Sequence, residues 1–251
     1  MSERPIAAGD VCMPAYLAEI YWWAYVHPRA IAVFERQWLV NVLLWGNFSR
    51  LRNAALKLLG ADLRGRTLQI ACVYGDLTCR LADRIGEQGT LDVLDVLPIQ
   101  LDNLRRKLRP SDRVRLIHGD SSKLGLETES YDRALLFFLL HEQPEEARRA
   151  TIAEALRVLK PGGRIVVVDY HRPHALHPLH WPMKFVLNAL EPFALDLWSH
   201  EIRHWLPQGD AIRSIRKKTS FGGLYQLLCI RKPFRGEEVS PESGSGAGPR
   251  A

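Results

Sequence analysis

The chain has 251 residues, 47% of them hydrophobic and 25% charged, which suits one globular domain with a short addition at one end. Its net charge of +6 favours an anionic partner, a membrane surface or a nucleic acid. No RNA-binding or helix-turn-helix pattern occurs, so we expect no nucleic-acid partner. No run of about twenty apolar residues exists for a membrane span. Four cysteines without C-x-x-C spacing indicate free thiols in a reducing cytoplasm. We therefore expect a cytoplasmic protein, peripheral to the inner face of the membrane.

The first 62 residues are expected to form an aromatic helical cap. Residues 13–59 have helical spacing and carry many Trp and Tyr side chains, with a break near Pro28 and further helices at residues 30–45 and 49–59. The aromatic side chains either pack on the main domain or form a lid over a greasy substrate. Both interpretations remain open for different faces of these helices.

From residue 63 to residue 235, short apolar runs alternate with amphipathic stretches, which is typical of an α/β fold with a parallel sheet and helices on both faces. Ligands bind beyond the carboxyl ends of such strands, so we expect the functional residues to lie there. The predicted strands are residues 67–72, 90–95, 114–118, 133–139, 164–169 and 223–230, and the predicted helices are 77–85, 98–108 and 144–159. Basic clusters at 105–107, 148–149 and 213–218 are interpreted as solvated helix faces.

The segment TLQIACVYGDLT, residues 67–78, predicts a strand, a turn and the start of a helix. Leu68, Ile70 and Cys72 supply the apolar strand, and Gly75 permits the turn. Asp76 and Thr78 are able to cap the next helix. The segment has the place and shape of a nucleotide-binding loop.

Two aspartates follow the next two strands. Asp95 ends its strand about twenty residues after the turn, where a carboxylate accepts hydrogen bonds from ribose hydroxyls. Asp120, in HGDSS with Ser121, is placed to accept from an adenine amine. Either aspartate alone is explained equally by helix capping. With LRVLKPGG at residues 156–163, a helix end, a turn and a strand start, an accidental arrangement is much less expected.

The motifs TLQIACVYGDLT, LDVLDVLPIQL, HGDSS and RVLKPGGRIVVVD resemble class I S-adenosylmethionine-dependent methyltransferases of the quinone-methylating type, over roughly residues 63–170. HEQP, DYHRPH and the N-terminal YWWAYVHP resemble a narrower group, the rhodoquinone biosynthesis (RquA-like) family. That resemblance implies a Rossmann-like methyltransferase fold. It also implies that ubiquinone loses a methoxy group and gains an amine from S-adenosylmethionine, with help from manganese.

The loop departs from the usual methyltransferase pattern of one acid and three glycines. Gln69, Ala71 and Val73 replace the acid and the first two glycines. Without the acid, the donor's ammonium is held less firmly, which favours a free amine that attacks a quinone. Val73 and Tyr74 fill space that glycines would leave open. The expected donor-binding residues are Gln69, Val73, Tyr74, Gly75, Asp95, Val96, Asp120 and Ser121.

Four side chains after the fourth and fifth strands are candidate metal ligands: His141, Glu142, Asp169 and His171. Mixed carboxylate and imidazole ligation suits Mn²⁺, and equally zinc or iron. A metal would bind quinone oxygens and draw electron density from the ring. Tyr74 and His141 are the candidate catalytic residues. Each residue by itself is also explained as a polar loop residue.

Three further features remain. Histidines recur every third residue from His171 to His180, in a proline-rich loop. The motif His200-Glu201-Ile202-Arg203-His204 formally matches the H-E-x-x-H zinc pattern, which we interpret as chance. An aromatic insertion at about 172–206, carrying Phe185, Phe193, Trp198 and Trp205, walls a pocket for an isoprenoid tail or packs in the core. Residues 236–251 are expected to be a disordered tail.

Three hypotheses follow for the function. The first is amino transfer to ubiquinone in rhodoquinone formation. The second is an ordinary methyltransferase acting on a lipophilic quinol or phenol. The third is a noncatalytic quinone- or lipid-binding module, because the glycine loop is eroded.

Overall fold

The computed structural model describes residues 13–20, 37–207 and 212–236. The predicted break at Pro28, the start of the helix predicted at residues 30–45 and the predicted tail lie outside the described residues. In chain order the elements are α1 (Ala15–Ile20), α3 (Gln37–Leu43), α4 (Phe48–Leu59), β1 (Leu63–Ile70), α5 (Leu77–Ala82), β2 (Ile85–Asp95), α6 (Pro98–Lys107), β3 (Val114–His118), β4 (Tyr131–Phe137), the 3-10 helix η2 (Leu140–Glu142), α7 (Glu145–Val158), β5 (Leu159–Tyr170), α8 (His180–Leu190), α9 (Asp196–Ser199), the 3-10 helix η3 (Ile202–Trp205), β6 (Ser214–Ser220) and β7 (Tyr225–Arg231).

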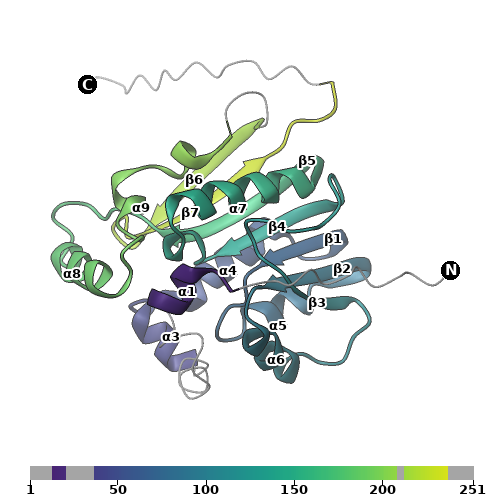
Figure 1. Cartoon of the computed structure of the whole chain (residues 1–251), viewed down its shortest axis with the longest axis horizontal. Coiled ribbons are helices and arrows are strands. Elements are labelled where there is room, and N and C mark those ends of the chain that lie inside the picture. The colour runs from purple at the N-terminus through teal and green to yellow at the C-terminus, as the bar shows by residue number, and fades with distance from the viewer. Residues whose placement is uncertain (1–12, 21–36, 208–211, 237–251) are drawn as a thin grey trace.

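The strands form one seven-stranded sheet in the order β3-β2-β1-β4-β5-β7-β6 (Figure 1). Strands β1 to β5 pair in parallel, whereas β7 runs antiparallel to both β5 and β6. The order reverses between β1 and β4, so the loops after these strands diverge and leave a crevice at their carboxyl ends. The prediction of a Rossmann-like methyltransferase fold is confirmed, and its switch point lies directly after residues 63–70.

Alternate side chains of each strand enter two apolar cores. On β4, Leu135 and Phe137 face the core covered by α4, α5 and α8, while Ala134 and Leu136 face the core covered by α7 and η3. In Figure 1, α7 lies in front of the sheet and α4 behind it. Because both faces are covered, the central strands are continuously apolar, which is the pattern the sequence displays.

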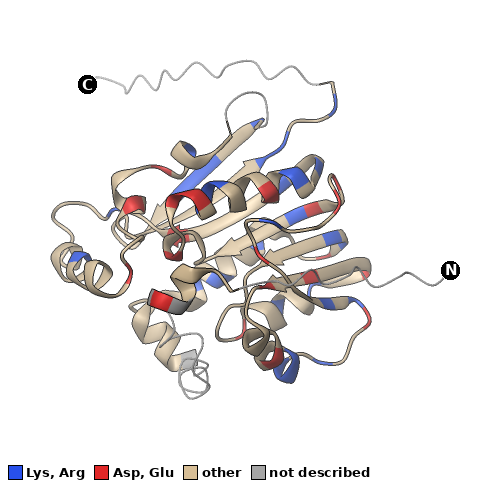
Figure 2. Ribbon diagram, viewed as in Figure 1, with Lys and Arg blue, Asp and Glu red and all other residues tan. Residues whose placement is uncertain are grey.

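Strand β6 was not predicted, and the interpretation of its basic cluster as a helix face is wrong. Its sequence SIRKKTS has no apolar alternation because it is the edge strand, largely exposed apart from its ends. Lysine and arginine on an edge strand hinder pairing with other chains. Figure 2 shows these basic residues along the outer strand. Arg148 also departs from the expectation of a solvated face, since it is fully buried.

Insertions surround this sheet at one end. Helices α8, α9 and η3 occupy the segment between β5 and β6, where the aromatic insertion was predicted, and α1, α3 and α4 precede β1. No helix of the described segments is both long enough and apolar enough to cross a membrane.

Candidate active site

A pocket lies at the carboxyl ends of β1, β2, β3 and β4, at the switch point of the sheet. Its walls come from the loops after these strands, from η2 and from α1, which lies across it (Figure 1). Predicted donor-binding residues that line it are Tyr74, Asp95, Val96, Asp120 and Ser121. Pro14, Tyr16, Ala71, Cys72, Gln100, Phe138, Glu142 and Gln143 line it as well. The structure therefore brings together residues that are far apart in the sequence.

The loop after β1 has a glycine-like backbone without the glycine. Ala71 has a φ of 71°, a conformation that favours glycine because a Cβ atom is strained there. Gly75 has a φ of 83°, and an added Cβ would lie 3.0 Å from the ring of Phe48. The loop thus keeps the usual turn of this fold at Ala71 despite the loss of the first glycine. Such strain is concentrated at functional sites.

Gln69 supports this loop from below. It is fully buried, and its Nε2 donates to the Ala71 carbonyl and to Thr78 Oγ1, both at 3.0 Å. A carboxylate in this place could not make the first contact, because both groups would be acceptors. Gln69, Val73 and Gly75 do not line the pocket, so their expected role in donor binding acts through the loop's shape.

Asp95 joins the first two loops at the pocket wall. Its Oδ2 accepts a hydrogen bond from the Cys72 backbone N–H (2.6 Å), and its Oδ1 accepts from the Leu97 N–H (2.8 Å). Burial raises the pKa of this carboxyl against those hydrogen bonds. Each carboxylate oxygen has a second lone pair, so Asp95 is still able to accept from a ligand hydroxyl.

Asp120 and Ser121 form the third side of the pocket. Asp120 Oδ1 accepts from both the backbone N–H and the hydroxyl of Ser122, at 2.8 Å each. Within the described part of the chain, its Oδ2 receives no hydrogen bond. Gln143 Nε2 donates to Ser121 Oγ (2.9 Å), and Gln143 Oε1 is buried without a partner among these residues. Asp120 Oδ2 and Gln143 Oε1 are therefore acceptors available to a ligand amine or hydroxyl.

Two tyrosines, Tyr74 and Tyr16, line the pocket. The hydroxyl of Tyr74 accepts a hydrogen bond from Gln100 Nε2 at 2.8 Å. Tyr16, on α1, is packed edge-to-face on Phe193, and burial raises its pKa to about 12. The free volume between these walls is about 100 Å³, whereas small-molecule sites usually measure roughly 300–1,000 Å³. The free volume is therefore below the usual size of a small-molecule site.

His141 and Asp169 form a buried pair behind the pocket wall. His141 Nδ1 lies 2.9 Å from Asp169 Oδ1, and its Nε2 lies 3.8 Å from Glu142 Oε1. Burial alone would lower the His141 pKa, but Asp169, Glu191 and Glu142 overcome it and raise the pKa to about 9. The imidazole also packs edge-to-face on Phe138 and Tyr170. At neutral pH His141 is thus an imidazolium between two carboxylates, and Glu142 is the member that lines the pocket.

The four predicted metal ligands do not converge. Asp169 is occupied by His141 and by the backbone N–H groups of Leu140 and Tyr170. His171 lies apart, with Nδ1 2.7 Å from the Gly223 carbonyl and Nε2 3.5 Å from Glu201. Within the described ranges no three His, Cys, Asp or Glu side chains are placed to hold a metal ion. His141, Glu142 and Asp169 lie close together because β4 and β5 are neighbouring strands. The chain turns away after β5, so His171 lies elsewhere.

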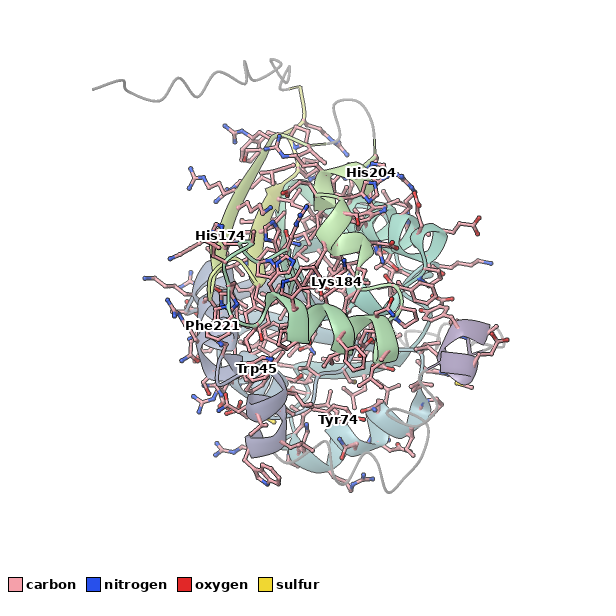
Figure 3. All side chains as sticks on the ribbon, turned by 90° about the vertical axis from the view of Figure 1, so that its left-hand side faces the viewer. Trp45, Tyr74, His174, Lys184, His204 and Phe221 are labelled. Atoms are coloured by element: carbon pink, nitrogen blue, oxygen red, sulfur yellow. The ribbon has the colours of Figure 1, made fainter. Side chains whose placement is uncertain are left out.

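The H-E-x-x-H motif is outside the pocket. His200 and His204 stack with centroids 4.5 Å apart, while Glu201 pairs with Lys217. The motif begins at the residue after α9 and runs into the 3-10 helix η3, and it is therefore not one α-helical face. In Figure 3, His204 and Tyr74 lie at opposite ends of the molecule.

The aromatic insertion divides between core and surface. Trp198 and Trp205 are buried, and Phe193 contacts Tyr16 at the pocket. Phe185 points into solvent. Tyr16, Gln100 and Gln143 are pocket residues that the sequence reasoning missed. Gln143 directly follows the predicted His141 and Glu142, and this position was the available signal for it.

Comparison with known proteins agrees with the observed fold. Residues 67–163 match the family model described as a methyltransferase domain. Residues 67–163, less than half of the chain, are thus similar to a methyltransferase domain. The matched residues include the loop after β1, both pocket aspartates and the His141 turn.

The matches to curated relatives and solved structures are longer than the segment that the family model matches. The chain is 27% identical over 150 residues to a demethylmenaquinone methyltransferase of Bacillus licheniformis, covering 58% of this chain and 64% of that protein. It is 28% identical over 135 residues to the enzyme of the same name from Staphylococcus saprophyticus, covering 54% and 57%. The chain thus matches less than two thirds of the length of these relatives.

Among solved structures, an O-methyltransferase family protein from Burkholderia thailandensis has a TM-score of 0.59 at 18% identity, covering 84% of this chain and 62% of that one. The N-methyltransferase NodS from Bradyrhizobium japonicum, in complex with S-adenosyl-L-homocysteine, has a TM-score of 0.55 at 14% identity, covering 82% and 97%. The [4+2]-cyclase SpnF has a TM-score of 0.53 at 21% identity, covering 74% and 80%. These likenesses concern the fold, which by itself does not select a reaction.

Proposed function

We propose that this protein transfers a methyl group from S-adenosylmethionine to a lipophilic quinol. The observation that carries the proposal is the Asp169–His141–Glu142 chain at the wall of a pocket that also holds Asp95 and Asp120. The matching curated relatives are demethylmenaquinone methyltransferases, which supports a quinol acceptor.

The nucleoside half of the donor fits the residues present. Asp95 has free lone pairs for the ribose hydroxyls, and Asp120 Oδ2 is available for the adenine amine. Gln143 Oε1 is a further unpaired buried acceptor beside them. When bound, the donor supplies an electrophilic methyl group on a sulfonium. The loop at Ala71, where φ is positive, and the ring of Tyr74 border the space left for its methionine tail.

The acceptor half must lose a proton, because a quinolate is a stronger nucleophile than a quinol. Glu142 lines the pocket and is the carboxylate able to take the quinol's O–H proton. The donor's sulfur–methyl bond then breaks as the methyl carbon bonds to the quinolate, and S-adenosylhomocysteine leaves. His141 stays charged at neutral pH, and Asp169 fixes its ring through Nδ1. The imidazolium orients Glu142 and stabilises the negative charge that develops nearby. Phe138 excludes water from this side of the pocket.

Amino transfer to ubiquinone is the second candidate. Its support is local: the amide Gln69 stands where the usual pattern has an acid, and Tyr74 crowds the methionine end. The manganese that this reaction implies does not fit the residues present, since Asp169 is saturated with hydrogen bonds and His171 lies elsewhere. We therefore derive no step through a metal.

A doubly labelled donor tests both candidates together. Purified protein receives S-adenosylmethionine labelled at the methyl carbon and at the amino nitrogen, with reduced demethylmenaquinone or ubiquinone as acceptor. Mass spectrometry of the quinone then reports which label has moved. Methyl label in the product, lost in Glu142→Gln, supports methyl transfer. Nitrogen label supports the second candidate and overturns the first. If neither label moves while the donor still binds, both proposals fail.

A further inference from the structure

We propose that α3 and α8 together form a surface that docks on an anionic lipid bilayer. In the described part of the chain, every exposed large hydrophobic side chain except Phe234 belongs to α3, its following turn, α8 or the loop before α8. We call this surface the apolar face. Its members are Trp38, Val42, Leu43, Trp45, Leu176, Trp181, Phe185, Val186 and Leu190.

The two halves of the apolar face are joined. Trp45 Nε1 donates to Met183 Sδ at 3.1 Å, which ties the turn after α3 to α8. Figure 3 shows α8 facing the viewer with Trp45 beside it. A water-soluble monomer seldom keeps one large contiguous apolar patch without a partner. The apolar face is therefore expected to be covered by a binding partner.

Helix α8 does not need its outer side chains for folding. Met183 and Leu187 are buried and hold the helix on the core. Trp181 and Phe185 are 71% and 76% exposed on the opposite side. An amphipathic helix that lies flat on the protein, with aromatic residues outward, has the form of an interfacial membrane helix.

Charge selects a bilayer as the occupant. Residues 37–61 and residues 170–190 contain no aspartate or glutamate, whereas both stretches carry basic residues. Exposed cations among these are Arg50, Lys57, Arg172 and Lys184. In Figure 2, α3 and α8 are almost free of charge apart from Lys184. An apolar centre whose exposed charges in these two stretches are all basic complements anionic headgroups above an acyl layer.

The aromatic residues also suit a bilayer better than a second protein chain. Three tryptophans contribute to the face, and indole rings prefer the headgroup boundary. The Lys184 ammonium lies 5.5 Å from the centroid of Trp181, so its stem covers apolar surface while its charge remains at the polar edge.

The apolar face leads toward the pocket. The chain leaving α8 brings Phe193 against Tyr16, and Tyr16 lines the pocket. A docked protein would thus receive a lipophilic acceptor from the layer in which that acceptor dissolves. This last step rests on the proposed function, whereas the docking itself rests only on the surface.

Vesicle flotation of the full chain tests the docking without donor or acceptor. We expect flotation with vesicles of phosphatidylcholine and phosphatidylglycerol, and weaker flotation with phosphatidylcholine alone. The double variant Trp181→Gln with Phe185→Gln should lose partitioning at least about tenfold. Phe234→Gln is the matched control, because Phe234 is exposed but lies outside the face. It should float like the unchanged protein.

Two further measurements keep the proposal open to refutation. Lys184→Glu should weaken flotation with the anionic vesicles only. Thermal unfolding of each variant must match the unchanged protein, which is expected because the altered side chains are exposed. Equal flotation of the double variant and Phe234→Gln would overturn the proposal. So would a dimer in light scattering that the double variant dissociates, since a second copy would then cover the face. Loss of labelled transfer with intact flotation would refute the proposed function instead.

Discussion

At the scale of single residues, the site depends on groups whose neighbours fix their chemistry. The position of Asp95 and Asp120 at the pocket was predictable, because a polar residue directly after an apolar strand lies at the ligand-binding edge of a parallel sheet, whereas their role in donor binding stays a prediction. Tyr16 and Gln100 were not, since nothing in AYLAEI or in the start of α6 distinguishes a pocket residue from an ordinary helix residue. His171 was placed wrongly in a shared ligand set, because the direction of the chain beyond β5 is not written in its local pattern.

The imidazolium of His141 makes the stability of the fold depend on pH. Its pKa of about 9 in the folded protein lies above the ordinary 6.5. The pair's contribution is therefore complete below pH 6.5 and is lost as pH rises through about 9, and it amounts to about 3 kcal/mol. Urea unfolding at about pH 6 and about pH 9.5 should show this loss, and His141→Gln should flatten it. An equal pH dependence in the variant would refute the charged pair.

The amide of Gln69 is expected to be more than a neutral replacement for an acid. Gln69→Glu places a carboxylate against the Ala71 carbonyl and removes the donor to Thr78. Because the site is fully buried, we expect a loss of about 2–3 kcal/mol in the free energy of unfolding. Denaturant unfolding measures it. Unchanged stability would mean that the loop tolerates the usual acid and that the departure has no structural cause.

At the scale of elements, the strands with continuous apolar runs were predictable and β6 was not. Residues 133–139 and 164–169 were recognised because both faces of their strands are buried. SIRKKTS gave no such signal, because an edge strand pairs through its backbone on one side and leaves most side chains in water. The start of β1 was also placed late, since Leu63 is followed by three exposed or half-buried residues, Arg64, Gly65 and Arg66, before the continuously buried run begins.

Arg148 links three elements near the site. Its side chain is fully buried and donates to the carbonyls of Leu140, Gln143 and Phe193. The Arg148 guanidinium carbon also lies 4.4 Å from the centroid of the Trp205 ring, which connects η3 to the same side chain. Arg148→Met should therefore lower the free energy of unfolding by about 3 kcal/mol or more, because three buried acceptors lose their donor.

The adjacent residue provides the control. Arg149 is only partly buried: it pairs with Glu145 one helical turn away and donates to the His204 carbonyl. Arg149→Met should lower the free energy of unfolding by no more than about 1 kcal/mol, because its ion pair and its hydrogen bond to the His204 carbonyl are both open to water. Thermal and urea unfolding of both variants compare them directly. Similar losses at the two positions would contradict the role of Arg148 as the link between η2, α7 and the insertion.

At the scale of the whole molecule, the pocket and the helices of the apolar face lie at the same end of the sheet (Figure 1). The sheet order places the pocket at the reversal between β1 and β4, and the insertion after β5 brings α8 beside the N-terminal helices. The sheet was predictable from alternating segments. The joining of α3 and α8 was not, because it depends on a contact between residues 138 positions apart.

The central claim is that this pocket holds the donor's nucleoside, and titration calorimetry with S-adenosylhomocysteine tests it most directly. The unchanged protein should bind, and Asp95→Ala and Asp120→Ala should each weaken binding by about tenfold or more. Asp102→Ala, an exposed acid on α6 away from the pocket lining, should bind normally. Absence of binding, or equal affinity in all three variants, would contradict the account.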